Sequence, residues 1–345
     1  MTKISRSEIY DKNLNFLIGS GASFGLLPTL ALEIKVGDTD ENHSIETLAT
    51  RFSDNDDIKA LLFSWYVKNI IKPASEFDLD FDLIFTDAQE VAVKNYETFI
   101  TSILTLLSKK STRNKANIFT TNYDGLVAHV AERMLLHGGV DFVINDGGSG
   151  FIKRHLNSRT FGRHYQDQGV FDRHAKNVPQ INLMQLHGSV YWYKDDESIE
   201  ISYDFDRSKA RIEGVPIREM GAFDVLLADS TKSDSDLEAL GIGKDDDANI
   251  NFWSAYESLP VVNPTKWKFH ETVFEEHYYQ MLRLLSYELE KPDTVFIAFG
   301  FSFADEHILN LVKRSLSNPT LKVFICCFSA KTQIDLKRKW FCRKF

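Results

Sequence analysis

Cysteine is scarce in this sequence, and its scarcity argues against a structural zinc site. The 345 residues contain three cysteines, Cys326, Cys327 and Cys342, and none of them belongs to a CxxC pair. Paired cysteines are the usual ligands of structural zinc, so neither zinc nor another bound metal is expected. The same usage fits a reducing, cytoplasmic compartment. Cys326 and Cys327 lie in an apolar run, which predicts a core strand there.

Long apolar runs and an excess of positive charge are also missing. No stretch of about 18 apolar residues could span a membrane, and the first ten residues lack the apolar segment of a signal peptide. The formal net charge of −9 at pH 7 opposes direct binding to nucleic acid, because such binding needs a basic face. We therefore expect no membrane contact, and contact with nucleic acid only through a partner.

The residues that are present predict an α/β fold. The hydrophobic share is 43% and the charged share 26%, as in ordinary globular proteins. Apolar runs of strand length alternate with helical spacing, which predicts a Rossmann-like parallel sheet with helices on both faces. Strands are expected at 14–18, 117–120, 140–144, 181–186, 294–299 and 321–328. Helices are expected at 24–33, 45–71, 96–107, 124–136, 271–290, 304–316 and 331–345.

We expect one domain over residues 1–345, with a smaller inserted subdomain that is helical and irregular. The Rossmann-like core is expected at about 10–36, 95–150, 181–194 and 260–330. A helical insertion is expected at about 40–94, an acidic insertion at about 195–250, and a basic helix at 331–345. Residues 195–247 contain 16 Asp and Glu against 6 Lys and Arg. That imbalance predicts flexible parts, especially at 230–235 and 241–247.

The first predicted strand ends in the small residues Gly19-Ser20-Gly21-Ala22-Ser23. Glycines carry no Cβ that would keep a phosphate away, and a helix at 24–33 would direct free backbone N–H groups to the same point. The stretch therefore predicts a phosphate cradle. A tight turn is the alternative, because Phe24 stands where the dinucleotide fingerprint has its third glycine.

Three further strand ends carry polar or small residues. Thr121, Asn122 and Asp124 follow the strand at 117–120, His187 follows 181–186, and Gly300 with Ser302 follows 294–299. Because ligands bind beyond the carboxyl ends of parallel strands, we expect these side chains to face one site. The alternatives are a helix N-cap at 120–124, a structural histidine at 187 and a simple turn at 300–302.

In this order, GSGAS at 19–23, TTNYD at 120–124, LHGS at 186–189 and GFSF at 300–303 resemble the sirtuin-like NAD-hydrolysing proteins of bacterial anti-phage defence. GLLPTL at 25–30 and VNPTK at 262–266 also resemble stretches of that family. The resemblance implies that the pyrophosphate of NAD is held by Gly19, Ser20, Gly21, Ala22 and Ser23. It implies that Thr121, Asn122 and Asp124 lie at the nicotinamide ribose, that His187 is the catalytic histidine, and that Gly300 and Ser302 line the adenosine half.

Two departures from the deacylases of that family bear on the substrate. The two CxxC pairs of their zinc ribbon are absent, and GLLPTL replaces their Gly-Ile-Pro-Asp-Phe-Arg-like loop. The expected activity is therefore hydrolysis of NAD+ to ADP-ribose and nicotinamide, as the NAD-depleting effector of a defence system that works by abortive infection. A non-catalytic NAD or ADP-ribose sensor is the alternative, and a protein deacylase is less favoured. The resemblance also implies a homo-oligomer and a HerA-type translocase ATPase as partner.

The three proposed catalytic residues have distinct roles in this hypothesis. Nicotinamide leaves as a neutral molecule, so no strong general acid is required, and the transition state resembles an oxocarbenium ion. Asn122 would hold the attacking water or the ribose through its amide. His187 would accept a proton from a ribose hydroxyl or from that water. Asp124 would orient the ribose or stabilise the cation by its charge.

Overall fold

The computed structural model describes residues 4–76, 86–109, 114–168, 175–261 and 272–341. The chain forms two compact units, each built from separate chain segments. The first comprises residues 1–26, 79–187 and 276–345, and we call it the sheet unit. The second comprises residues 27–78 and 188–275, and we call it the helical unit.

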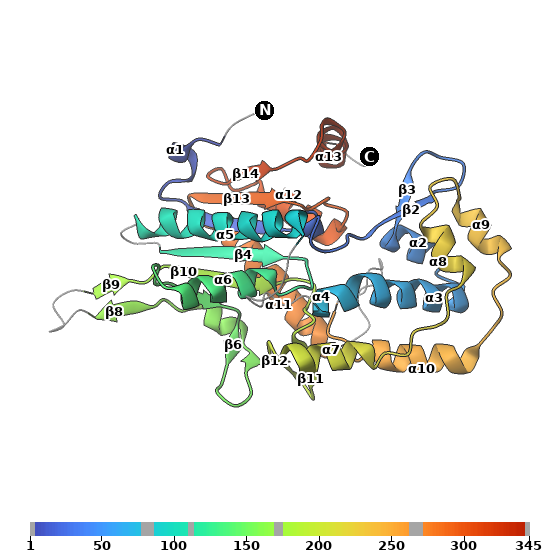
Figure 1. Cartoon of the computed structure of the whole chain (residues 1–345). Helices are drawn as coiled ribbons and strands as arrows, with labels where there is room; N and C mark the ends of the chain where they lie inside the picture. Colours follow the sequence, from blue (N-terminus) through green and yellow to red (C-terminus); the bar gives the residue numbers. More distant parts are fainter. Residues whose placement is uncertain (1–3, 77–85, 110–113, 169–174, 262–271, 342–345) are drawn as a thin grey trace. The chain divides into compact units, whose positions relative to one another are not determined.

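A six-stranded parallel sheet forms the centre of the sheet unit (Figure 1). Its strands are β1 (Asn13–Ile18), β4 (Lys115–Thr120), β5 (Val143–Asn145), β10 (Gln180–Gln185), β13 (Thr294–Phe299) and β14 (Lys322–Ile325). Their spatial order is β14-β13-β1-β4-β10-β5, and every neighbouring pair is parallel. The predicted Rossmann-like α/β fold is confirmed. The chain leaves β1 toward β4 and later returns to β13 on the other side, so the winding direction reverses at β1.

Helices cover this sheet, as predicted. They are α1 (Arg6–Ile9), α5 (Asp87–Ser108), α6 (Leu126–His137), α11 (Thr272–Glu290), α12 (Glu306–Ser315) and α13 (Ala330–Phe341). In Figure 1, α5 and α6 cross in front of the sheet and α11 behind it. Phe99 of α5 lies edge-on to Phe16 and Phe299, each ring centroid 5.1 Å away, so the helix packs directly over β1 and β13. Among the helices of the described ranges, none combines the length and apolar composition needed to cross a bilayer.

Short elements connect the sheet strands. One turn of 3-10 helix, η1 (Ser20–Ser23), follows β1, and another, η3 (Ser158–Gly162), precedes β10. A hairpin joins β6 (Gly148–Ser149) to β7 (His155–Leu156). A second hairpin joins β8 (Gln166–Gln168) to β9 (Ala175–Asn177). Its β8 residues are exposed.

The helical unit combines the two segments that were expected as separate insertions. Its first segment holds β2 (Ala31–Lys35), β3 (Asn42–Ser44), α2 (Ile45–Arg51), α3 (Asp56–Tyr66), the π-helical η2 (Val67–Ile71) and α4 (Lys72–Glu76). Its second holds β11 (Trp192–Asp195), β12 (Ser198–Ile201), α7 (Phe205–Glu213), α8 (Ala222–Leu227), α9 (Asp234–Ala239) and α10 (Asp246–Tyr256). Phe63 of α3 packs against Trp253 and Tyr256 of α10, with ring centroids 5.2 and 5.3 Å apart.

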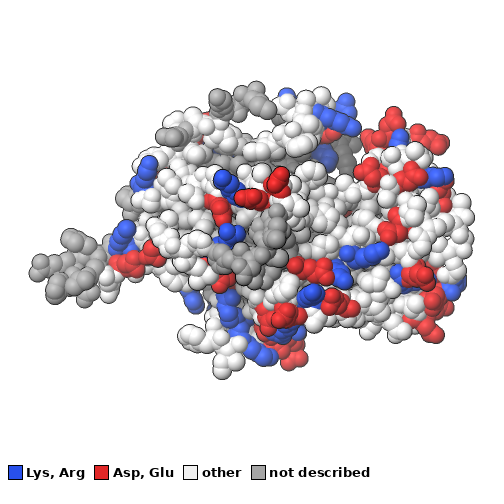
Figure 2. Space-filling model, in the orientation of Figure 1, with Lys and Arg blue, Asp and Glu red and all other residues white. Residues whose placement is uncertain are grey.

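Charged residues of both signs lie on the described surface of the helical unit. Figure 2 shows acidic side chains gathered over β2 and β3, and acidic and basic side chains interspersed over α10. The loop between β2 and β3 carries the exposed residues Asp38, Asp40 and Glu41. The acidic composition of this unit therefore does not come from residues 195–250 alone.

Two predicted helices are wrong. The helix expected at 24–33 is replaced by a turn at Gly25, with φ of +89°, and by β2. Leu32 and Ile34 are buried between exposed neighbours, which is the period of two of a strand. The helix expected at 45–71 is interrupted at 52–55, where the Asn55 side chain accepts the Ile58 N–H at 3.0 Å and starts α3. The helical conformation also continues beyond its predicted end at residue 71. Residues 67–71 adopt π-helical geometry, and Pro73 then lies near the start of α4.

The expectation of a core strand at the cysteine pair is wrong as well. Cys326 is exposed and Cys327 half-buried, because β14 is an edge strand and ends at Ile325. Residues 230–235 include Asp234, which is buried at the start of α9 and accepts the Gly37 N–H at 3.0 Å. Residues 241–247 include Asp245, the N-cap of α10. Asp245 caps α10, whereas the N-cap of α9 is Ser233, whose backbone N–H donates to Asp236 at 2.9 Å.

Candidate active site

Four strand ends meet at one edge of the sheet, as expected from the sequence. Ile18 pairs with Thr120 on one side and Phe299 on the other, and Thr120 pairs with Gln185. Backbone bonds continue past the strands: the Thr121 N–H donates to Ile18 at 3.0 Å, and the Leu186 N–H to Thr120 at 2.7 Å. The residues that follow β1, β4, β10 and β13 therefore begin at the same level.

The glycines after β1 and β13 pack against each other. The Gly19 N–H donates to the Phe299 carbonyl at 3.1 Å, and the Gly21 N–H to the Gly300 carbonyl at 2.9 Å. A Cβ on Gly19 would lie 2.8 Å from the Phe301 Cα, and Gly300 has a φ of +63°. These contacts require glycine at 19 and 300. Close backbone packing thus explains the glycines, as the alternative of a tight turn predicted.

The turn after β1 differs in two ways from the predicted phosphate cradle: its amides are already hydrogen-bonded, and no long helix follows it. The amide of Ala22 donates to the Gly19 carbonyl at 2.9 Å, so the amides of residues 19, 21 and 22 all have backbone partners. No long helix follows the turn, since η1 has four residues. Ser20, Ala22, Thr121 and Gly300 are half-buried and Gly21 and Ser302 exposed, which leaves the edge open at these positions.

Ser23 connects the turn after β1 to Asn122. The Asn122 side-chain N–H donates to Ser23 Oγ at 3.2 Å, and the Asn122 backbone N–H donates to Thr120 Oγ1 at 3.0 Å. Ser23 Oγ lies 2.9 Å from the Tyr96 hydroxyl and 3.5 Å from Asp124 Oδ2. A serine oxygen accepts two hydrogen bonds and donates one, so Asn122 and Tyr96 donate and Ser23 donates to Asp124.

The side-chain carbonyl oxygen of Asn122 takes no part in this network. Asn122 is 7% exposed, and its Oδ1 is buried without a hydrogen-bond partner among the described residues. Because its NH2 group is held by Ser23, the orientation of the amide is fixed. A buried acceptor without a partner is costly unless something donates to it. The arrangement is therefore suited to receive a hydroxyl or a water.

Asp124 is a buried member of the same network. Burial raises its pKa to about 6, against hydrogen bonds that favour the carboxylate. Its Oδ1 accepts the Leu126 N–H at 3.0 Å at the start of α6, whereas the N-cap residue of that helix is Gly125, which has no side-chain cap. Burial and the nearby Asp124 together raise the pKa of Tyr96. Tyr96, on α5, was not among the predicted site residues, and only its helical face is visible in the sequence.

His187 forms a separate buried pair with Asp305. Its Nε2 lies 3.1 Å from Asp305 Oδ2, and the two residues are 7% and 6% exposed. Asp305 is the N-cap of α12, where its Oδ1 accepts the N–H groups of His307 and Ile308 at 2.9 and 3.2 Å. The ring of Tyr278 lies 6.1 Å from the imidazole. Asp305 was missed because its partner lies 118 positions away.

The other residues predicted for the site differ in their surroundings. Ser302 Oγ accepts the Ala304 N–H at 3.4 Å, and its carbonyl accepts from Lys339 at 3.2 Å, so it takes part in the turn before α12. The stretch VNPTK at 262–266 lies outside the described residues. In the described part of the chain no group of three or more His, Cys, Asp or Glu is placed to hold a metal ion.

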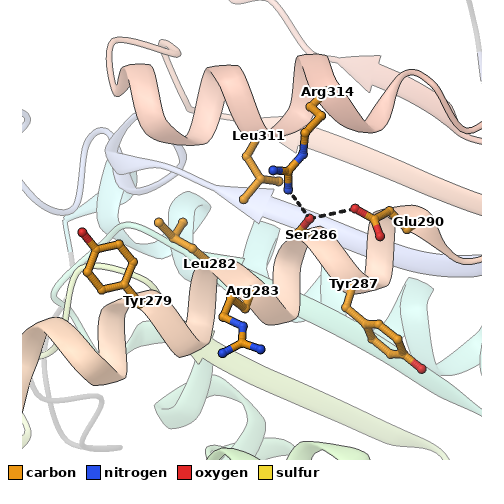
Figure 3. A pocket seen from close by; sticks show the side chains of 8 residues that line it. All are labelled: Tyr279, Leu282, Arg283, Ser286, Tyr287, Glu290, Leu311 and Arg314. Atoms are coloured by element: carbon orange, nitrogen blue, oxygen red, sulfur yellow. Dashed lines mark hydrogen bonds between the residues drawn. The ribbon is translucent and has the colours of Figure 1, made fainter.

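A groove of about 400 Å³ lies between α11 and α12 and does not include these residues (Figure 3). Its lining consists of Tyr279, Leu282, Arg283, Ser286, Tyr287, Glu290, Leu311 and Arg314. Arg314 donates to Ser286 Oγ at 2.7 Å, which in turn donates to Glu290 at 3.0 Å. The groove is thus a separate surface feature, in which Ser286 links Arg314 to Glu290.

No protein-family model matches the chain, and no curated protein is significantly similar to it.

Proposed function

We propose that the protein is an NAD+ hydrolase that cleaves the bond between nicotinamide and ribose. The observation that supports this most is the buried Asn122, whose carbonyl lacks a partner among the described residues, at the same strand ends as the buried His187–Asp305 pair. An amide acceptor and an imidazole base are the groups that this hydrolysis requires. Their order along the chain also agrees with the family resemblance of the sequence.

In the proposed mechanism each residue acts at a defined atom. Asn122 accepts a hydrogen bond from a ribose hydroxyl or from the attacking water through Oδ1, because its NH2 group is bound to Ser23. His187 accepts a proton from one of these hydroxyl groups as general base. Asp124 contacts Ser23 and the start of α6, so we assign it a positioning role and an electrostatic one through the Ser23 network.

The wider setting is proposed from the resemblance alone. It comprises a cytoplasmic, NAD-depleting effector of anti-phage defence, a homo-oligomer, and a HerA-type translocase ATPase as partner. No zinc is required by the proposed chemistry. Control by assembly is expected, because an enzyme that depletes NAD must stay silent until infection.

Nicotinamide release from NAD+ tests this function. The wild-type protein is compared with the Asn122→Ala and His187→Ala variants, alone and with the product of the neighbouring gene. The exposed histidine at position 164 provides the control variant His164→Ala. Release that both site variants abolish and the control retains supports the proposal. Binding of NAD+ in calorimetry without release would identify a sensor. A protein that neither binds NAD+ nor releases nicotinamide would contradict the proposal.

A further inference from the structure

The turn that leads from β13 to α12 holds Asp305 in one orientation. Gly300 has a φ of +63° and Phe303 a φ of +52°, a left-handed conformation that is unfavourable for a residue with a side chain. Phe303 is 1% exposed and packs edge-on against Phe301 and Trp340, with ring centroids 4.9 and 5.4 Å away. This packing stabilises the unusual backbone, and the turn delivers Asp305 to the start of α12.

The two oxygens of Asp305 have separate partners. Oδ1 accepts two backbone N–H groups of α12, and Oδ2 faces His187 Nε2 at 3.1 Å. A helix N-cap needs only one side-chain oxygen. The second oxygen is therefore turned toward the imidazole while the first fixes the carboxylate. Since a carboxylate only accepts, the hydrogen in this bond belongs to Nε2.

We propose that Asp305 is the positioning residue of His187 and that Nδ1 is the atom that acts as general base. This inference rests on the proposed function. Asp305 holds the neutral imidazole with its proton on Nε2, so the lone pair is on Nδ1. During the reaction Nδ1 accepts the proton from a ribose hydroxyl or water. The resulting imidazolium is stabilised by the Asp305 carboxylate, which keeps its charge and takes up no proton.

Asp305→Asn separates this role from helix capping. Asparagine caps helices as well as aspartate does, so α12 is retained, whereas the charge opposite His187 is lost. Asp305→Ala removes both. Asp245→Asn is the matched control, because Asp245 caps α10 by accepting the Ala248 N–H at 3.1 Å. Tyr278, on α11, also faces the imidazole in the described part of the chain, and it is unchanged in all three variants.

The first measurement is the tautomer of His187, from the nitrogen-15 NMR signals of the imidazole, identified by their loss in His187→Gln. We expect Nε2–H in the wild-type protein and in Asp245→Asn, and a decrease of that form in Asp305→Asn at an unchanged unfolding temperature. This readout does not depend on NAD+ hydrolysis. A wild-type protein that releases no nicotinamide would contradict the proposed function, while the tautomer would still test the role of Asp305.

The second measurement is the pH dependence of nicotinamide release. With Asp305→Asn we expect kcat to fall on the order of 10²–10⁴-fold, with KM nearly unchanged, as when an orienting carboxylate is neutralised in a catalytic triad. The acid limb of the pH–rate profile should move to lower pH, because protonation of the imidazole loses its counter-charge. A tautomer and a kcat that both equal those of the wild-type protein would overturn the inference.

Discussion

Ser23 is the residue that joins the Asn122 side of the candidate site to the turn after β1. It is 2% exposed and contacts Asn122, Tyr96 and Asp124 through one hydroxyl. In the sequence it is the last of five small residues, and the family resemblance places it at a phosphate. The structure adds contacts from α5 and from the loop after β4, which sequence spacing does not reveal.

Ser23→Ala should therefore affect both stability and activity. Three buried polar groups would lose a partner, and the free energy of unfolding should fall by about 1–3 kcal/mol. Nicotinamide release should fall as well, because the Asn122 amide is no longer held. Urea unfolding and the release assay measure the two effects. Ser20→Ala, at a half-buried position in the same turn, is the control and should change the free energy of unfolding by less than about 0.5 kcal/mol.

Asp124 should make the folded protein less stable as the pH rises. Its folded-state pKa of about 6 lies above the ordinary aspartate value of 3.8. Between these values the native state binds more protons than the unfolded state, so the free energy of unfolding decreases with pH. The contribution is lost as the pH rises from about 4 to 6, and two pKa units correspond to roughly 3 kcal/mol.

Urea unfolding at pH 4 and pH 7 tests this linkage. The Asp124→Asn variant should lose less stability over this interval than the wild-type protein. The exposed Asp167 provides the control, and Asp167→Asn should keep the wild-type pH dependence. If the free energy of unfolding changed equally between pH 4 and pH 7 in Asp124→Asn and the wild-type protein, this carboxyl would not be the source of the pH dependence.

At the level of the elements, the mutual packing of the two glycine turns distinguishes Gly300 from other glycines. A Cβ at position 300 would overlap the Ala22 backbone, and the φ of +63° is unfavourable for alanine. Gly300→Ala should lower the free energy of unfolding by at least about 1–3 kcal/mol. Gly243→Ala is the control, since no atom lies within 4 Å of its ideal Cβ. Thermal unfolding of the two variants should differ clearly, and equal unfolding temperatures would contradict the packing argument.

The sequence predicted the strands of the sheet better than the elements between them. The strand at 294–299 agrees with β13 at both ends, because a buried parallel strand is a continuous apolar run. The helix expected at 24–33 is wrong because Leu32 and Ile34 lie two residues apart, which is the alternation of a strand and not a helical spacing. The same apolar runs located the ends of β1, β4, β10 and β13, after which the predicted site residues lie. The Asp305 partner of His187 depends on tertiary packing that local spacing does not encode.

At the level of the whole molecule, the helical unit depends on contacts between its two chain segments. Arg218 of the second segment donates to Asp57 of the first at 3.1 Å and to Asn249 at 2.7 Å. The Arg218 and Asp57 side chains are 11% and 13% exposed. Hydrogen bonds from Asn249 and Arg218 keep the pKa of Asp57 below its usual value despite the effect of burial. The network links residues that the sequence analysis assigned to separate insertions.

Arg218→Ala should destabilise the protein by about 1–3 kcal/mol, because the partly buried Asp57 and Asn249 lose a charged hydrogen-bond partner. Lys232→Ala is the control, since Lys232 forms a more exposed pair with Asp236 at 3.3 Å. It should change the free energy of unfolding by less than about 1 kcal/mol. Urea unfolding measures both. Similar losses in the two variants would show that the Asp57–Arg218 pair does not hold the segments together.

The contact between the turns after β1 and β13 also sets the order of events during synthesis. Residues 19–21 come from the beginning of the chain and need residues 299 and 300 as hydrogen-bond acceptors. A growing polypeptide cannot complete this edge of the sheet until the ribosome has passed β13, and His187 lacks Asp305 until then. If the proposed activity is correct, truncated products of interrupted translation would leave the NAD pool of the cell intact.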